Sequence, residues 1–195
     1  MSKVKKNSNR SNANTLNARN ANSLSVSGSP FTPGAPSLTM RIPELIGKYT
    51  ATSGAVSGNT QLTAALITNF ATRFAAFDEY RILCFDFEIM PVSANTGTAM
   101  VWVEPLSNSA PTTATAQSNI GTFVNINAAC TKTPYKLRYA PTDSTLIGFQ
   151  PISTTTFGYG YLKVFTNAAD FASLAGNLDI IVVRAMITIQ FRGLA

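Results

Sequence analysis

Basic side chains gather at the N-terminal end of the chain, where they could neutralise a negatively charged partner. Residues 1–43 contain six Lys and Arg residues and no Asp or Glu. They are Lys3, Lys5, Lys6, Arg10, Arg19 and Arg41. The rest of the chain has nine basic and nine acidic residues, so the formal net charge of +6 falls entirely in this segment. A basic, acid-free segment on a neutral body is typical of nucleic-acid binding, and a merely solvated tail is the alternative.

The composition divides the chain into three parts. Residues 1–28 have no aromatic residue and are dominated by Asn and Ser, so they cannot bury enough apolar surface to offset their ordering entropy. We expect a flexible basic arm there, then a hinge over residues 29–37, where SPFTPGAP has three prolines. Residues 38–195 should form one folded domain. The arm has no apolar stretch typical of a secretory signal, and its Lys- and Asn-rich composition fits a transit peptide poorly.

The residue types that are missing weigh against an enzyme. The sequence has no His, which removes Ser-His-Asp and Cys-His catalysis and histidine metal sites. Its two cysteines, Cys84 and Cys130, are too few for a thiolate metal site. The segment GYGY lacks the following helix and the Lys-Ser/Thr pair of a phosphate-binding loop. We therefore expect a protein that is not an enzyme and has no catalytic residue.

Alternating apolar residues predict β-strands along most of the body. The segment FDEYRILCFDFEIMP is expected to be a strand with an apolar face and a polar face. We predict Leu83, Phe85, Phe87 and Ile89 on the apolar face, and Tyr80, Ile82, Cys84, Asp86, Glu88 and Met90 on the other. A last strand should place Ile181, Val183, Ala185, Ile187, Ile189 and Phe191 on one face. With short candidate strands at 45–52 and 61–68 and a Phe-rich helix after Asn69, about eight strands and two short helices predict an all-β antiparallel sandwich.

Low charge points to self-association. Only 12% of the residues are charged, about half of the roughly 25% usual in soluble domains. A subunit whose flanks are covered by copies of itself would not need charged flanks. We therefore expect a homo-oligomer.

The order of these segments resembles the shell domain of small icosahedral RNA-virus capsid proteins of the tombusvirus and sobemovirus type. In that family a short helix leads into the fourth strand through an aromatic-x-x-Tyr-Arg motif, and a Gly opens the fifth strand. Phe77, Tyr80, Arg81 and Gly97 stand at those places. The segment from Gly160 to Phe191 is similar to the family's penultimate strand, loop and final strand. The resemblance covers roughly residues 38–192.

The resemblance implies an eight-stranded jelly roll that assembles as a many-copy shell and encloses single-stranded RNA. It implies that the arm residues and Arg41 bind that RNA, that the chain resides in the virion, and that assembly occurs in the host cytoplasm. The family commonly binds calcium between subunits through an acidic cluster after the fifth strand. The matching VEPLSNSAP has Glu104 as its only carboxylate, and a hard cation needs several oxygen ligands, so we expect neither a metal site nor a cofactor.

A binding module is the alternative from a different class. It would be a secreted or cell-surface jelly roll, lectin-like or cytokine-like and trimeric, whose basic tail binds anionic ligands. The neutral body and the lack of a secretion signal argue against it. We expect neither a membrane partner nor a small-molecule substrate.

Overall fold

Two antiparallel sheets form the body in a computed structural model of the chain, which describes residues 24–27, 37–51, 55–92, 97–112, 122–126, 134–166 and 178–194. The larger sheet has the order β1 (Leu24–Ser27), β2 (Ser37–Ala51), β10 (Leu178–Leu194), β4 (Phe77–Pro91) and β7 (Tyr135–Tyr139), and β8 (Gln150–Pro151) also pairs with β4. The smaller sheet has the order β3 (Ser57–Gln61), β9 (Tyr161–Thr166), β5 (Gly97–Glu104) and β6 (Thr122–Ile126). A 3-10 helix (Ala64–Leu66) and α1 (Phe70–Arg73) connect β3 to β4.

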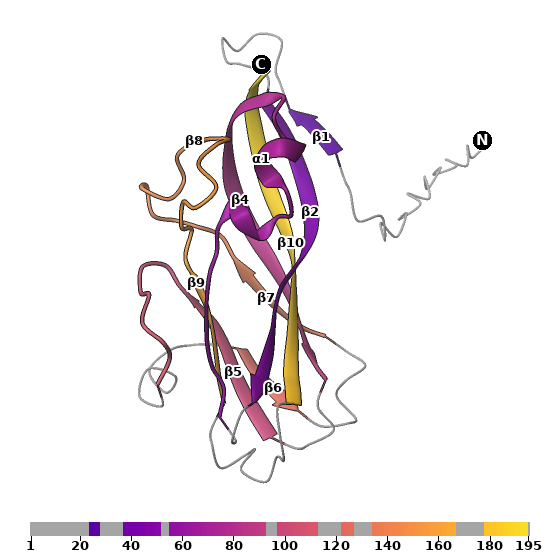
Figure 1. The fold of residues 1–195 in the computed structure, drawn as a ribbon, viewed down its shortest axis with the longest axis vertical. Helices are drawn as coiled ribbons and strands as arrows, with labels where there is room; N and C mark the ends of the chain where they lie inside the picture. The colour runs from indigo at the N-terminus through magenta and orange to yellow at the C-terminus, as the bar shows by residue number, and fades with distance from the viewer. Residues whose placement is uncertain are drawn as a thin grey trace, which may run out of the picture.

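This strand order is that of a jelly roll, which confirms the predicted fold class. Without the short β1 and β8, each sheet has four strands, and successive strands of the chain mostly alternate between the two sheets. The elongated body lies along β10 (Figure 1). The described residues contain ten strands rather than about eight, because β1 and β8 add short pairings to β2 and β4. No helix in the described parts is long and apolar enough to cross a membrane.

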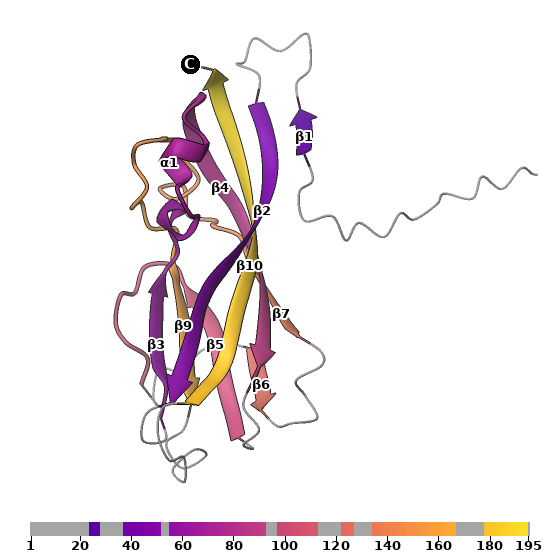
Figure 2. The ribbon, with the colours of Figure 1, turned by 45° about the vertical axis from the view of Figure 1, so that its right-hand side comes forward.

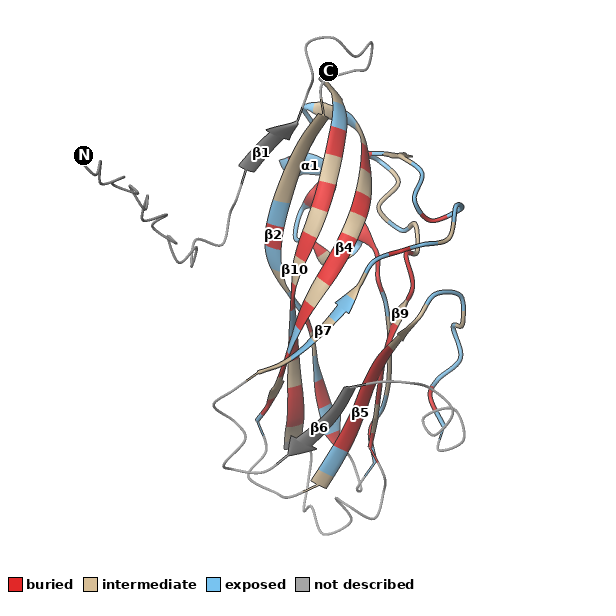
Figure 3. Ribbon diagram, turned by 180° about the vertical axis from the view of Figure 1, so that it is seen from behind, coloured by how far each residue is buried: buried red, intermediate tan, exposed pale blue. Residues whose placement is uncertain are grey.

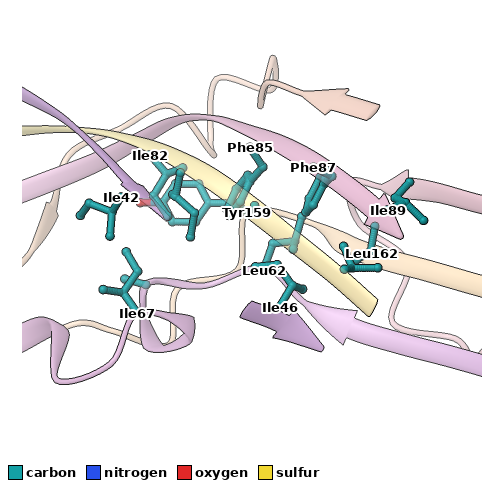
Figure 4. Packing of buried hydrophobic residues seen from close by; sticks show 14 of the residues in the cluster. Ile42, Ile46, Leu62, Ile67, Ile82, Phe85, Phe87, Ile89, Tyr159 and Leu162 are labelled. Carbon is teal, nitrogen blue, oxygen red and sulfur yellow. The ribbon is translucent and has the colours of Figure 1, made fainter. Parts of the chain in front are cut away.

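The core lies between the sheets and is lined by alternate residues of the long strands. On β10 the six residues expected on one face are all buried, and bands of buried and half-buried residues alternate along β10 and β4 (Figure 3). Phe85 and Phe87 of β4 face Leu62 and Leu162 from the other side of the core (Figure 4). The prediction for β10 is therefore confirmed.

The predicted faces of β4 are wrong in its first half. Tyr80 and Ile82 are buried in the core, with 0% and 1% of their surface exposed, whereas Leu83 is only half-buried. The pairing with β10 shows the reason: Thr188 lies opposite Cys84 and the next residue, Ile189, lies opposite Ile82. Leu83 is an extra residue on β4, and such a bulge reverses the in-and-out alternation beyond it.

Aromatic residues close one end of the core. Phe70 and Phe74 of the α1 region are buried, and the Phe191 ring lies 4.7 Å from Phe74 and 4.9 Å from Phe77 between centroids. The predicted helix after Asn69 is therefore present, although it is short. The predicted strand at 61–68 is wrong, since β3 ends at Gln61 and the 3-10 helix follows.

Part of the predicted arm pairs with the body. β1 lies antiparallel to β2, with Leu24 opposite Met40 and Ser27 opposite Ser37 (Figure 2). It extends the larger sheet at the β2 edge. The boundaries at residues 28 and 37 stay a prediction.

The bulge makes a sharp prediction about neighbouring residues. Ile82→Ala should lower the free energy of unfolding by about 2–5 kcal/mol, because it opens a cavity in the core. Leu83→Ala should cost markedly less, because Leu83 lies on the outer face. Chemical denaturation of both variants measures this difference, and equal losses would contradict the bulge.

Candidate nucleic-acid and assembly surfaces

Most of the predicted RNA-binding residues lie outside the described part of the chain. These are Lys3, Lys5, Lys6, Arg10 and Arg19. Arg41, the remaining one, lies on β2, and its side chain is 48% exposed on the outer face of the larger sheet. The structure therefore shows the setting of one predicted contact, and the others stay predictions.

Arg41 belongs to a group of three charged residues that come from β2, β4 and β7 and reach across the intervening β10. Its Nη2 lies 3.4 Å from Oδ2 of Asp86 on β4. Nη1 of Arg138, on β7, lies 3.4 Å from the other carboxylate oxygen of Asp86. Two guanidinium groups thus share one carboxylate, which leaves a net positive charge on this group of three residues. Asp86 is a counter-ion on an exposed sheet face, in line with the sequence-based view of its outward position.

A second row of charges crosses the same face next to this group. Glu88 on β4 lies opposite Arg184 on β10 and opposite Lys136 on β7. Both basic residues are exposed. Like the first group, this row combines two basic residues with one acidic residue, so the outer face of the larger sheet is weakly basic along these rows.

The Tyr-Arg motif holds two connecting loops against the larger sheet. The Tyr80 hydroxyl donates a hydrogen bond to the Thr154 carbonyl at 2.6 Å, and its burial raises its pKa. Arg81 donates to Gln190 at 2.8 Å, and its guanidinium lies 4.7 Å from the centre of the Phe149 ring. The motif therefore has a structural role in this chain.

Lys163 is a charged residue that the sequence analysis missed. It lies on β9, between the core residues Leu162 and Val164, and points away from the core, yet only 1% of its side chain is exposed. The segment following Glu104 covers it. The sequence offered one signal for Lys163, which is a lysine within an apolar strand of a chain that has few charges. That signal does not show which segment covers the side chain.

Four oxygen atoms surround the Lys163 ammonium. It donates hydrogen bonds to Oδ1 of Asn59 at 2.8 Å, to the Ser107 carbonyl at 2.8 Å and to the Ser109 carbonyl at 2.5 Å. A carboxylate oxygen of Glu104 lies 3.8 Å away. All three N–H donors are thus used. Burial lowers the pKa of Lys163 from its usual value, and the Glu104 carboxylate opposes this shift.

Further hydrogen bonds join the same segment to β3. Asn59 donates to the Asn108 carbonyl at 2.8 Å, and the Ser57 hydroxyl donates to the Pro111 carbonyl at 2.7 Å. We call residues 105–111 the cover loop. Within the described residues, no group of three His, Cys, Asp or Glu side chains could hold a metal ion.

Among the residues that the structure describes, four large apolar side chains are exposed. They are Leu45 on β2, Val92 after β4, Leu106 in the cover loop and Ile147 between β7 and β8. Leu106 is the most exposed of them, at 73%. Single exposed apolar residues are ordinary, so they mark positions to test for subunit contacts and do not by themselves define an interface.

Several solved structures that are similar to this chain come from viruses. The structure titled as Mud crab tombus-like virus has a TM-score of 0.62 at 10% identity, with 87% of this chain and 95% of that chain covered. Cocksfoot mottle virus has a TM-score of 0.57 at 14% identity, with 80% and 94% covered. Tobacco necrosis virus has a TM-score of 0.57 at 11% identity, with 82% and 97% covered. No protein-family model and no curated protein sequence matches the chain.

These similarities define the class of fold. The chain has the jelly-roll fold of the capsid shells of icosahedral RNA viruses, over nearly the full length of the matched chains. This agrees with the resemblance of the Tyr-Arg motif and the final strand. At such low identity the similarity establishes the fold and leaves the function to be argued.

The ion pair on the outer face makes a prediction about stability. Asp86→Asn should lower the free energy of unfolding by less than about 1 kcal/mol, because the pair is solvent-exposed and its charges are screened. A double-mutant cycle with Arg138→Gln measures the coupling. A coupling energy of several kcal/mol would contradict a merely exposed pair.

Proposed function

We propose that the protein is a viral capsid subunit that assembles into an icosahedral shell and packages single-stranded RNA through its basic N-terminal arm. The observation that carries this proposal is the jelly-roll fold shared with virus structures over 80% or more of this chain. The charge distribution supports the second half of it, because the whole net charge lies before residue 44. The proposal also includes a location in the virion and a structural, non-enzymatic role.

The proposed mechanism is electrostatic and collective. Lys and Arg side chains of the arm neutralise RNA phosphates and release condensed counterions. The first 28 residues have no aromatic side chain to stack on bases, so phosphate contacts dominate and the binding is insensitive to RNA sequence. Many arms in one shell act together, so weak individual contacts hold a long RNA.

Arg41 is the predicted RNA contact that the structure places on the body. Arg41 lies in the first half of β2 (Ser37–Ala51), close in sequence to the arm. Its partner Asp86 already neutralises part of its charge. Arg41 should therefore contribute less to RNA binding than the lysines near the N-terminus.

Assembly is the first prediction of the proposal. The purified protein should form closed isometric particles at neutral pH and moderate salt, visible by electron microscopy, because its few charges leave flanks suited to contact with other copies. A stable species near 20.8 kDa across concentrations in sedimentation experiments would overturn it. A trimer without particles would favour the secreted or cell-surface binding module.

The role of the arm is the second prediction. Replacing Lys3, Lys5 and Lys6 with Gln should reduce the slope of log affinity against log salt for single-stranded RNA by about two units, because each lost phosphate contact removes about 0.7. Preference among RNA sequences should not change. Filter binding or fluorescence anisotropy across a salt series measures the slope.

The body offers a matched control with the same loss of charge. Lys48, Lys136 and Arg184 are exposed on the larger sheet, and replacing all three with Gln should leave the slope nearly unaltered. If this control lowers the slope and the arm variant does not, the RNA contacts lie on the body and the assignment of the arm is wrong.

A further inference from the structure

The family resemblance implies a calcium site after the fifth strand, but the residues present there do not fit one. Glu104, at the end of β5, is the only carboxylate in the matching segment VEPLSNSAP. Calcium takes six to eight oxygen ligands, usually with several carboxylates. Here the cover-loop oxygens point at an ammonium group instead.

We propose that Lys163 acts as a built-in cation that holds the cover loop in place of an exchangeable metal ion. Its ammonium lies within hydrogen-bonding distance of two cover-loop carbonyls and of the Asn59 side chain, with the Glu104 carboxylate beside it. The position of the cover loop therefore does not depend on divalent cations. This inference concerns the subunit alone and stands apart from the proposed function.

The burial of Lys163 is the first reason for this inference. Lysine is almost never fully buried unless it is paired, because an unpaired charge loses its hydration. In this chain the desolvation is offset by three hydrogen bonds and one carboxylate. Removing the ammonium takes away the donor that these oxygen atoms share, so their hydrogen bonds to β9 are lost.

The second reason is that the bonds join segments far apart in the sequence. Lys163 is on β9, Asn59 is on the neighbouring strand β3, and Ser107 and Ser109 are in the cover loop after β5. Glu104 is itself oriented, because the Trp102 indole N–H donates to its other carboxylate oxygen at 3.0 Å. One ammonium thus fixes the loop against two strands of the smaller sheet.

The consequence is a preformed surface. The cover loop displays Leu106 with 73% of its surface exposed. Leu106 lies between the end of β5 and Ser107, whose carbonyl accepts a hydrogen bond from Lys163. A loop held by a covalently attached cation keeps this display at any calcium concentration. A loop held by a metal ion would loosen when the metal is removed.

The test on the unaltered full-length chain uses hydrogen–deuterium exchange of residues 105–112. Exchange should be the same with EDTA and with calcium chloride, because no exchangeable ion holds the loop. A rise of about threefold or more in exchange with EDTA, reversed by calcium, would overturn the proposal. This arm needs no variant to fold.

Substitutions test the ammonium itself. Lys163→Met removes the charge and keeps a chain of similar length, so exchange of residues 105–112 should rise about tenfold or more and the melting temperature should fall by about 5 °C or more. Lys48→Met is the matched control, because Lys48 is an exposed lysine on β2. It should change neither quantity. Unaltered loop protection in Lys163→Met, or an equal loss in the control, would overturn the proposal.

Chemical rescue separates charge from packing. Lys163→Ala leaves room for a small cation, and methylammonium chloride is the probe, with sodium chloride at the same ionic strength as the reference. Methylammonium should restore loop protection in Lys163→Ala but not in Lys163→Met, whose side chain still fills the space. Absence of rescue in a folded Lys163→Ala, or equal rescue by sodium chloride, would overturn the role of the ammonium.

If neither Lys163 variant folds, Glu104→Gln replaces them. It removes the charge of the carboxylate that lies 3.8 Å from the ammonium, so it should loosen the cover loop. Unaltered protection of the loop in Glu104→Gln would count against the proposal.

Discussion

The pairing of β10 between β2 and β4 is the constraint on which the rest of the structure depends. β10 is hydrogen-bonded on both edges, and its inward residues from Ile181 to Phe191 are buried. A strand with one buried face cannot slip by one residue without turning its apolar side chains to water, so its register is strongly specified. That register also fixes the outward residues of its neighbours, which is how Arg41 and Asp86 come together from strands far apart in sequence.

The two groups of charges on the body obey different physics. The pairs of Asp86 with Arg41 and Arg138 lie in solvent, where water screens them and where either arginine could exchange Asp86 for another anion at little cost. The Lys163 ammonium is out of water, so its partners must be in place for the fold to tolerate it. The exposed charges therefore suit changing partners, and the buried one suits a permanent structural contact.

The distribution of charge along the chain helps to explain how a protein with so few charges could perform the proposed capsid function. The body is neutral and the basic residues in excess precede residue 44. Attraction to a polyanion and contact between copies can then be separate, because neither the core nor the sheet register depends on the arm's charges. The proposed capsid function needs this separation, since the shell geometry must not vary with the RNA sequence enclosed.

Sequence alone determined the features that follow from local periodicity and composition. Alternation of apolar residues predicted an antiparallel β-sandwich and the buried face of β10. The resemblance to capsid shell domains implied that the sandwich is a jelly roll, and counting charges predicted the basic arm. The bulge at Leu83 was out of reach, because an inserted residue reverses the alternation only through the pairing of β4 with β10. Lys163 was out of reach for a related reason: two of its partners are backbone carbonyls of Ser107 and Ser109, and every residue has a carbonyl, so no side-chain pattern marks them. Only the tertiary structure, by folding the cover loop across β9, decided that this lysine is buried.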